Sequence, residues 1–170
     1  KLTGFNIKNV ANSNISAVNF KTTGNTDLTC INVDDVNYAT TNWTQIDAHT
    51  SFSLKCGFTY IPDDNFEQAL IDLGYDTDAL DDYVPDATIK TLTSLDVSSK
   101  SIANLTGIED FVALTTLNIS NNNLSSINLN ANTSLENLDC SHNQLTSLDA
   151  TLLTSLKTLV ANNNQLTAID

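Results

Sequence analysis

The sequence predicts an α/β repeat solenoid, a curved stack of short parallel strands whose arrays are closed by dedicated end segments. Three observations lead to this fold class. An apolar pattern recurs four times between Leu92 and Asp170. A single amphipathic helix pattern precedes it, and two cysteines bracket an aromatic-containing stretch near the start of the 170-residue chain. Because such repeats bury their apolar sides only against their neighbours, we expect the fold to extend in one direction.

The repeat unit is clearest in three successive segments that are related by steps of 21 residues. A step of 22 residues recovers one earlier unit, with Lys100 at the asparagine position. The pattern L-x-x-L-x-L-x-x-N-x-L at a period of 20 to 29 residues is typical of a leucine-rich repeat horseshoe. Residues 92–170 therefore form about four units, with these equivalent positions: Leu92, Leu95, Val97, Ile102 and Leu105; Leu114, Leu117, Ile119, Asn122, Leu124 and Ile127; Leu135, Leu138, Cys140, Asn143, Leu145 and Leu148; Leu156, Leu159, Ala161, Asn164, Leu166 and Ile169.

Each unit begins with a short strand whose side chains alternate between two faces. In the third unit, Leu138 and Cys140 point to the core, and Asn137 and Asp139 point outward. Stacking such strands about 4.8 Å apart gives a parallel sheet over a continuous leucine core. Cys140 is expected to be a small buried hydrophobic residue.

The asparagines at the end of each strand are expected to form a structural ladder. The chain turns away from the sheet there, and buried backbone groups need hydrogen-bond partners that no strand supplies. Asn122, Asn143 and Asn164 carry both donors and acceptors, so a stacked column can bond the turns of its own and the adjacent unit. Lys100 cannot place an ammonium group in this core, and we expect an altered first turn from which the lysine side chain reaches solvent.

Residues 62–91 are expected to close the start of this array with an N-terminal capping helix and an acidic turn. Asp63 is a suitable N-cap, and acidic residues in the first turn are favoured by the helix dipole. Phe66, Leu70 and Leu73 lie on one apolar face, and Gly74 ends the helix.

The acidic turn gives a weak calcium candidate, and we expect no other cofactor. Eight acidic residues and no lysine lie between Asp63 and Asp82. Calcium loops alternate oxygen ligands along a turn, but this segment lacks the glycine at the bend and the closing glutamate. The alternative is a solvated acidic turn. The candidate ligands are Asp76, Asp78, Asp81 and Asp82.

Residues 1–56 are expected to be the end of another array with its C-terminal cap. A degraded repeat pattern covers the first 33 residues and is expected to stop there. Residues 34–56 then hold three aromatic residues among polar ones, as a cover over the open end of a solenoid requires. The degraded positions are Leu2, Phe5, Ile7, Ile15, Val18, Phe20, Leu28, Ile31 and Val33, and the covering aromatics are Tyr38, Trp43 and Phe52.

Cys30 and Cys56 lie at the two ends of this cover, which favours a disulfide and an oxidising compartment. Such a bond stabilises the cover by roughly 3 kcal/mol on loop-entropy grounds. No third thiol lies near enough in sequence to suggest a zinc site. Residues 57–61 are interpreted as a connector between the two arrays.

Composition narrows the choice of partners. The formal charge is −13, and all seven basic residues are lysines. Nucleic acid and anionic lipid are disfavoured, because both require a basic surface. No apolar run is long enough for membrane insertion, and we interpret the chain as a mature or trimmed fragment. His49 and His142 stand apart from any nucleophile or second ligand, so we expect no catalytic site and no enzyme.

These motifs resemble a known group of proteins. IPDDNFEQALIDLGYDTD, LTSLDVSSKSIANLTGIEDFVALTTLNIS and units ending in NNQLTSLD or NNQLTAID are similar to leucine-rich repeat regions of secreted or cell-surface proteins from Bacteroidetes, notably marine flavobacteria. LTGIEDFVALTTL also resembles the repeats of internalins, and residues 28–56 resemble the element that closes such arrays. The resemblance implies surface exposure and adhesion or ligand binding. The closing element precedes the opening one here, so the chain combines the end of one array with the beginning of the next.

This order leaves apolar strand edges at both ends. Exposed edges favour pairing with another chain, so we expect a head-to-tail or swapped homo-oligomer, with intramolecular capping as the alternative. The edges comprise Leu2, Phe5 and Ile7 at the front and Leu156, Leu159 and Ile169 at the back.

The outward face of the strands is the expected ligand-binding face, although the alternative is that its residues are merely solvated. It lacks the aromatic residues and arginines that mark sugar platforms and protein hot spots. We expect a non-catalytic interaction or adhesion module that binds a protein or another macromolecule. The alternative is a spacer, or a polysaccharide-targeting attachment of a larger secreted carbohydrate-active protein. The face residues are Ser94, Asp96, Thr116, Asn118, Asn137, Asp139 and Thr158.

Overall fold

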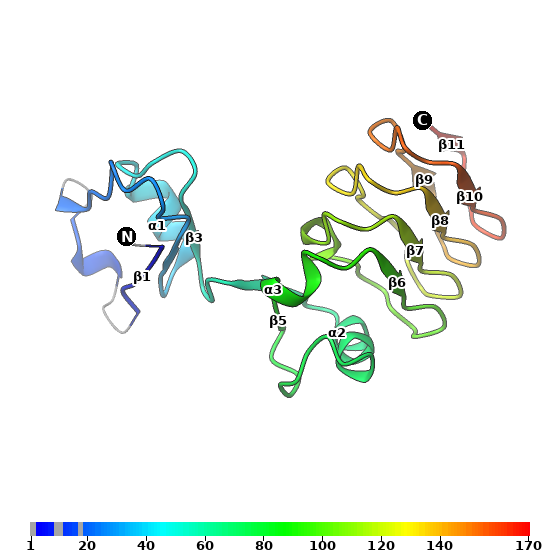
Figure 1. Cartoon of the computed structure of the whole chain (residues 1–170), viewed down its shortest axis with the longest axis horizontal. Coiled ribbons are helices and arrows are strands. Elements are labelled where there is room, and N and C mark those ends of the chain that lie inside the picture. Colours follow the sequence, from blue (N-terminus) through cyan, green and yellow to red (C-terminus); the bar gives the residue numbers. More distant parts are fainter. Residues whose placement is uncertain (1–2, 9–11, 17–18) are drawn as a thin grey trace. The chain divides into compact units, whose positions relative to one another are not determined.

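The computed structural model describes residues 3–8, 12–16 and 19–170, and the chain divides into two compact units (Figure 1). Unit 1 is residues 1–57 and unit 2 is residues 58–170. Both contain parallel strands joined by crossover segments, and unit 1 contains a disulfide. The predicted leucine-rich repeat solenoid with a disulfide-stapled segment is confirmed. Among the described residues, no helix is long and apolar enough to cross a membrane.

Unit 1 is built on a parallel sheet of three strands in the order β1 (Gly4–Asn6), β2 (Cys30–Asn32) and β3 (Ser51–Ser53). Phe5, Ile31 and Phe52 are in register across it. The expectation that the repeat pattern stops after Val33 is wrong, because β3 follows β2 at the same 21-residue step as the later repeats. Phenylalanine rather than leucine occupies the central position of β3, so a search for repeated leucines does not find this unit. Leu2 and Val18 lie outside the described residues.

The segment between β2 and β3 packs its aromatic residues into the core of unit 1. Helix α1 (Val36–Asn42) begins after Asp35, whose carboxylate accepts a hydrogen bond from Tyr38 N at 2.8 Å. Trp43 directly follows the helix and is completely buried. Its ring stacks on Phe20 with centroids 4.1 Å apart, and its Nε1 donates to the carbonyl of Ile15 in the segment after η1 (Asn12–Asn14). The cover is therefore folded around one buried tryptophan.

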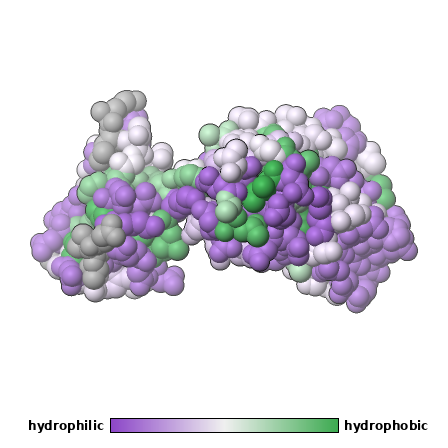
Figure 2. Space-filling view, turned by 90° about the horizontal axis from the view of Figure 1, so that it is seen from below, coloured by the Kyte–Doolittle hydropathy of each residue, from purple (hydrophilic) through white to green (hydrophobic). Residues whose placement is uncertain are grey.

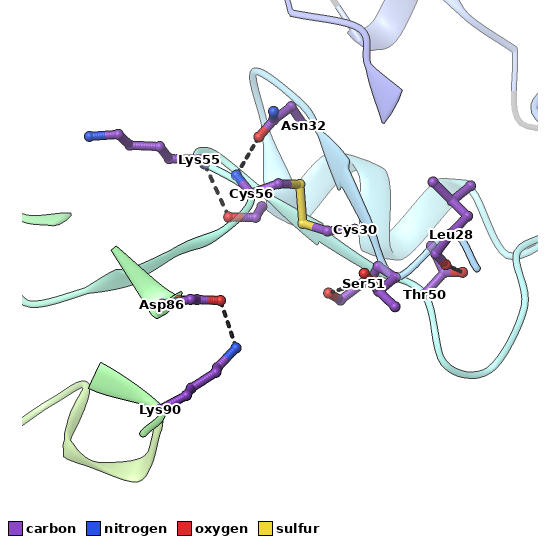
Figure 3. The surroundings of a disulfide bond; sticks show 11 residues. Leu28, Cys30, Asn32, Thr50, Ser51, Lys55, Cys56, Asp86 and Lys90 are labelled. Carbon is purple, nitrogen blue, oxygen red and sulfur yellow. Dashed lines mark hydrogen bonds and ion pairs between the residues drawn. A yellow bond between two sulfur atoms is a disulfide. The ribbon is translucent and has the colours of Figure 1, made fainter. Parts of the chain in front are cut away.

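The predicted disulfide between Cys30 and Cys56 is confirmed (Figure 3). It joins β2 to the end of the cover, with the two Cα atoms 5.8 Å apart. Asn32 on the same strand accepts a hydrogen bond from Cys56 N at its Oδ1, 2.6 Å away. The end of the cover is thus held to β2 by a covalent bond and a hydrogen bond.

Unit 2 opens with a cap made of two antiparallel strands and two short helices. Strands β4 (Phe58–Tyr60) and β5 (Tyr83–Pro85) pair with each other, and α2 (Asp64–Asp72) and α3 (Asp86–Ile89) follow them in turn. Residues 57–61 therefore do not form a free connector, because most of the segment is β4 of this cap. The segment GFTYI contributes a strand to the cap. Five residues are too few to show a strand periodicity in the sequence.

Helix α2 is fixed at its start by Asp63, which bonds in two directions. Its Oδ1 accepts from Asn65 N and Phe66 N, and its Oδ2 accepts from Ala103 N and Asn104 N in the first repeat. Phe66 and Leu70 are completely buried, but Leu73 is 44% exposed, because it is the C-cap residue where the helix unwinds. One carboxylate therefore both caps the helix and attaches it to the repeats.

The acidic turn is organised by a glutamate inside the cap. Glu67 on α2 is completely buried, and its two carboxylate oxygens accept from Asp81 N and Asp82 N. Asp76 Oδ1 accepts from Thr77 N and Asp78 N. Within the described part of the chain, no three acidic, histidine or cysteine side chains gather to hold a metal ion. The backbone of Asp81 and Asp82 is thus held by a buried carboxylate, and calcium binding by the four candidate aspartates stays a prediction.

The repeats of unit 2 stack their strands in the order β6 (Ser94–Asp96), β7 (Thr116–Asn118), β8 (Asn137–Asp139) and β10 (Thr158–Val160) (Figure 1). All pairings are parallel and in register. A second pair, β9 (Ser147–Leu148) and β11 (Ala168–Ile169), joins the last two repeats on their return segments, and η3 (Ile108–Asp110) lies in the first. Cys140 is completely buried in the leucine core, as expected.

The ladder asparagines bond turns of their own and the preceding repeat. Asn122 Nδ2 donates to the carbonyls of Val97, Ile119 and Ser120 at 3.0 to 3.3 Å, and its Oδ1 accepts from Lys100 N and Ile102 N. Asn143 and Asn164 repeat this geometry one and two units further on. Each amide therefore links two neighbouring turns.

Lys100 departs from the ladder as expected. Its side chain is 38% exposed and pairs with Asp72 of the capping helix, with Nζ and Oδ2 3.1 Å apart. Ser99 and Ser101 on either side have positive φ angles, whereas the corresponding turns of later units have a single such residue. The altered turn carries the lysine away from the core and toward the cap.

Asn122→Ala is expected to destabilise unit 2 by about 3 kcal/mol, because several buried carbonyl and amide groups lose their partner at once. Urea unfolding followed by circular dichroism measures this. Asn130→Ala is the control, since that side chain is exposed and makes no hydrogen bond within the described residues. Similar unfolding midpoints for the two variants would contradict a structural role for the ladder.

Reduction of the Cys30–Cys56 bond is expected to destabilise unit 1 by about 3 kcal/mol, because the unfolded chain regains the freedom of the closed loop. Trp43 is the one tryptophan of the chain and lies in unit 1, so its fluorescence follows that unit alone. The Cys140→Ser variant, reduced and oxidised, separates the disulfide from the free thiol. A tryptophan transition that does not move on reduction would exclude stapling.

The thiol of Cys140 is expected to be inert in the folded protein. Desolvation by burial, together with the nearby charge of Asp139, raises its pKa to about 11. At pH 8 only about one thiol in a thousand is then ionised, and the side chain is also shielded from reagent. A disulfide reagent such as Ellman's compound should react only after guanidinium is added. Rapid labelling of native protein would show that the repeat core opens readily.

Candidate interaction surface

The sheet face of unit 2 consists of the first and third residues of β6, β7, β8 and β10, which point outward. The central residues Leu95, Leu117 and Leu138 are each 1% exposed and face the core. The parallel register brings the predicted face residues together in two rows that run across the strands. The first row is Ser94, Thr116, Asn137 and Thr158, and the second is Asp96, Asn118, Asp139 and Val160.

Hydrogen bonds hold the second row in place. Asp96, Asn118 and Asp139 each accept at Oδ1 from the backbone N–H two residues later, so each closes the turn at the end of its strand. Asn118 Nδ2 also donates sideways to Asp96 Oδ2 at 3.1 Å. These side chains thus have a structural role and are presented to solvent in fixed positions.

Hydrogen bonds of this kind lower the pKa of Asp96. Partial burial would by itself raise the pKa of Asp96, but hydrogen bonds from Ser98 and from Asn118 outweigh it, and the pKa is lowered overall. Asp96 is therefore ionised at neutral pH, with both oxygens engaged by Ser98 N and Asn118 Nδ2. In Asp139 the two hydrogen bonds go to one oxygen, because Ser141 N and Ser141 Oγ both donate to Oδ1.

A shallow depression of about 130 Å³ lies between the two rows over β7, β8 and β10. It runs over the central residues Leu117 and Leu138, and Asp139 is the one charged residue in its lining. Its lining is Thr116, Leu117, Asn118, Asn137, Leu138, Asp139, Thr158 and Val160. Six of the eight belong to the rows of the face, so the predicted surface is slightly hollowed there.

Two larger hollows lie away from the sheet face. One of about 320 Å³ is in unit 2, between the return segments of the first two repeats. It is lined by Asn104, Leu105, Thr106, Glu109, Ser126, Ile127 and Asn128. Another of about 340 Å³ is in unit 1, beside Trp43, Ile46 and Phe52. The first has a mostly polar lining and the second a mostly apolar one.

The two histidines are in different units. His49 Nε2 lies 3.4 Å from the carbonyl of Asn25. His142 Nε2 lies 2.9 Å from Asn163 Nδ2 on the next turn. Each contact joins a histidine to a neighbouring loop or turn. His49 also lies near Asp47, whose pKa is lowered chiefly by a hydrogen bond from Gly24 N and to a smaller extent by the charge of His49.

Apolar side chains are exposed at the strand edges where pairing with another chain was expected. Phe5 on β1 is 39% exposed, Leu159 on β10 is 37% exposed and Ile169 on β11 is 53% exposed. Both outer edges thus present unpaired strands with partly apolar side chains. The oligomer stays a prediction.

Sequence reasoning identified the face residues but not the differences between them. Asp96 and Asp139 occupy equivalent positions, and only the structure shows that the Asn118 amide turns toward Asp96. The depression and the buried Glu67 were also missed, since both depend on how segments far apart in the sequence pack. The one available signal for Glu67 was its place within the apolar face of the capping helix.

The net negative charge is confined to unit 2. Unit 1 has four aspartates and four lysines, whereas unit 2 has the other sixteen acidic residues and three lysines. The whole formal charge of −13 therefore belongs to unit 2. Hydrophilic residues predominate over the visible surface of this unit (Figure 2).

Comparisons with known proteins agree with this architecture. Family models for leucine-rich repeats match residues 113–132 (Leucine Rich Repeat) and 133–170 (Leucine Rich repeats, 2 copies). Internalin J of Listeria monocytogenes is 37% identical over 86 residues, which are 48% of this chain and 9% of that protein. The chain thus spans a small part of this relative.

Solved structures of internalins are also similar. The functional domain of InlJ from Listeria monocytogenes is 37% identical with a TM-score of 0.61, over 69% of this chain and 27% of that one. InlF from the same species is 25% identical with a TM-score of 0.58, over 63% and 32%. The InlJ domain is described as including a cysteine ladder, whereas the repeats here contain one cysteine, Cys140. The chain therefore contains an internalin-like leucine-rich repeat region.

Proposed function

We propose that unit 2 is a non-catalytic interaction module of a secreted or cell-surface protein and that its sheet face binds a protein partner. The observation that carries this proposal is the fixed row of Asp96, Asn118 and Asp139, whose side chains are ordered before any partner arrives. Preorganised polar groups lose little conformational entropy on binding. The likeness to internalin repeats supports an interaction role, and the disulfide of unit 1 supports an oxidising compartment.

A polysaccharide-targeting role is the second candidate, and the polar hollow of unit 2 favours it. Amides, hydroxyls and a carboxylate surround this hollow, and such groups can bond sugar hydroxyls. It has no aromatic residue in its lining, which distinguishes it from most sugar platforms. Protein binding at the sheet face therefore remains the first proposal.

The test compares two triple-lysine variants of the full chain on arrays of surface proteins and of glycans. Asn118→Lys, Asn137→Lys and Thr158→Lys together change the sheet face. Ser125→Lys, Asn130→Lys and Thr133→Lys make the same charge change on exposed positions between β7 and β8. We expect a saturable protein ligand whose binding falls at least about tenfold with the first set, because three long side chains obstruct the face. The second set should leave the affinity nearly unchanged.

Other outcomes would redirect the proposal. Equal loss with both sets would indicate a general charge effect and exclude the sheet face. Glycan binding that survives both sets but is lost on Glu109→Gln would favour the second candidate and place the ligand in the polar hollow. Circular dichroism of each variant establishes that the repeats are folded.

A further inference from the structure

Asp139 is distinguished from every other polar residue of the sheet face by an unengaged carboxylate oxygen. Its Oδ1 accepts both bonds from Ser141, and no described residue donates to its Oδ2. The neighbours explain this. On one side the Asn118 amide is turned to Asp96, and on the other side Val160 has no donor to offer.

The depression beside this carboxylate has the size of one long side chain. Its volume of about 130 Å³ is far below the several hundred cubic ångströms of a pocket for a small-molecule ligand. Its floor follows the backbone of Leu117 and Leu138, and Thr158 and Val160 border its outer part. An unbranched aliphatic stem fits such a trough, with its polar end at Asp139.

Charge selects the class of side chain. Asp139 is the only charged residue of the lining, and unit 2 carries a formal charge of −13. An anion would be repelled, and an apolar side chain would leave the open oxygen of Asp139 without a donor. A cationic side chain on an aliphatic stem satisfies both the apolar walls and the open oxygen, because lysine and arginine bury their stems while the charged head remains hydrated or paired.

We infer that the depression between β7, β8 and β10 is a subsite for a lysine or arginine side chain of the partner protein, whose cationic head bonds Asp139 Oδ2. The inference rests on the proposed function and names the chemistry of the partner, a basic protein surface. The negative electrostatic field of unit 2 then attracts the basic surface of the partner, and the subsite fixes the position of the partner on the strands.

A lysine peptide tests the subsite directly. The full chain, labelled for amide nitrogen–proton correlation spectra, is titrated with Ac-Gly-Lys-Gly-NH₂ at low salt, and the same peptide with norleucine is the comparison. We expect saturable shifts centred on Asn137, Asp139 and Thr158 with the lysine peptide and none with norleucine. Asp139→Asn should weaken binding by about threefold or more, as expected for a partly exposed ion pair.

Asp149→Asn is the matched control. Asp149 accepts from Thr151 N and Thr151 Oγ1 at 2.9 and 2.6 Å, the same geometry as Asp139 with Ser141, but it lies outside the sheet face. Both substitutions remove one charge and keep the amide acceptor for the turn. Equal weakening by the two variants, or shifts spread over all acidic residues, would overturn the subsite and leave only general attraction.

Failure of the subsite and failure of the proposed function give different results. A protein ligand that is lost on changing the sheet face to lysine but is insensitive to Asp139→Asn keeps the face and overturns the subsite. A lysine peptide that binds at Asp139, together with a protein ligand indifferent to the face variant, keeps the subsite and overturns the proposed function.

Discussion

The turn at the end of each strand imposes the constraint on which unit 2 depends. Where the chain leaves the sheet, its carbonyl and amide groups point into an apolar core that contains no other backbone to pair with them. Asn122, Asn143 and Asn164 meet this need, each with one amide that donates to carbonyls and accepts from N–H groups in two adjacent turns. The repeat period follows from this, because an asparagine is needed at the equivalent position of each successive turn.

In unit 2 the first repeat follows the cap and not another repeat, so a different set of polar groups bonds the open end of the stack. Asp63 joins the capping helix to backbone amides of that repeat, and Lys100 replaces the ladder residue and pairs with Asp72 on the same helix. Glu67 holds the acidic turn from inside the cap. Carboxylates thus do at the end of the stack what asparagine amides do within it. A carboxylate only accepts, and backbone N–H groups of the cap and of the first repeat are its donors.

The periodic part of this fold could be predicted from the sequence, and the aperiodic part could not. Leucines and asparagines repeat because identical surroundings recur, so Leu138 or Asn143 can be assigned from spacing alone. The strand at residues 58–60 has no repeat context, and Phe52 stands at the 21-residue step but replaces the leucine of the pattern, so both were misjudged. The face residues were found by alternation. Their hydrogen bonds were not, since the Asn118 amide has two aspartate neighbours and the sequence does not state which one it bonds.

The different hydrogen bonding of Asp96 and Asp139 determines where the sheet face can bind a cationic group. A residue at the third strand position must give one oxygen to the turn that follows, which an aspartate or an asparagine can do. An aspartate then has one oxygen left, and its fate depends on the residue beside it in the row. The Asn118 amide lies between two aspartates and bonds that oxygen of Asp96, whereas the corresponding oxygen of Asp139 remains for a partner because Val160 on its other side has no donor. Binding capacity at such a position is therefore a property of neighbouring repeats taken in pairs, which explains how repeats with nearly identical cores can differ in what they recognise.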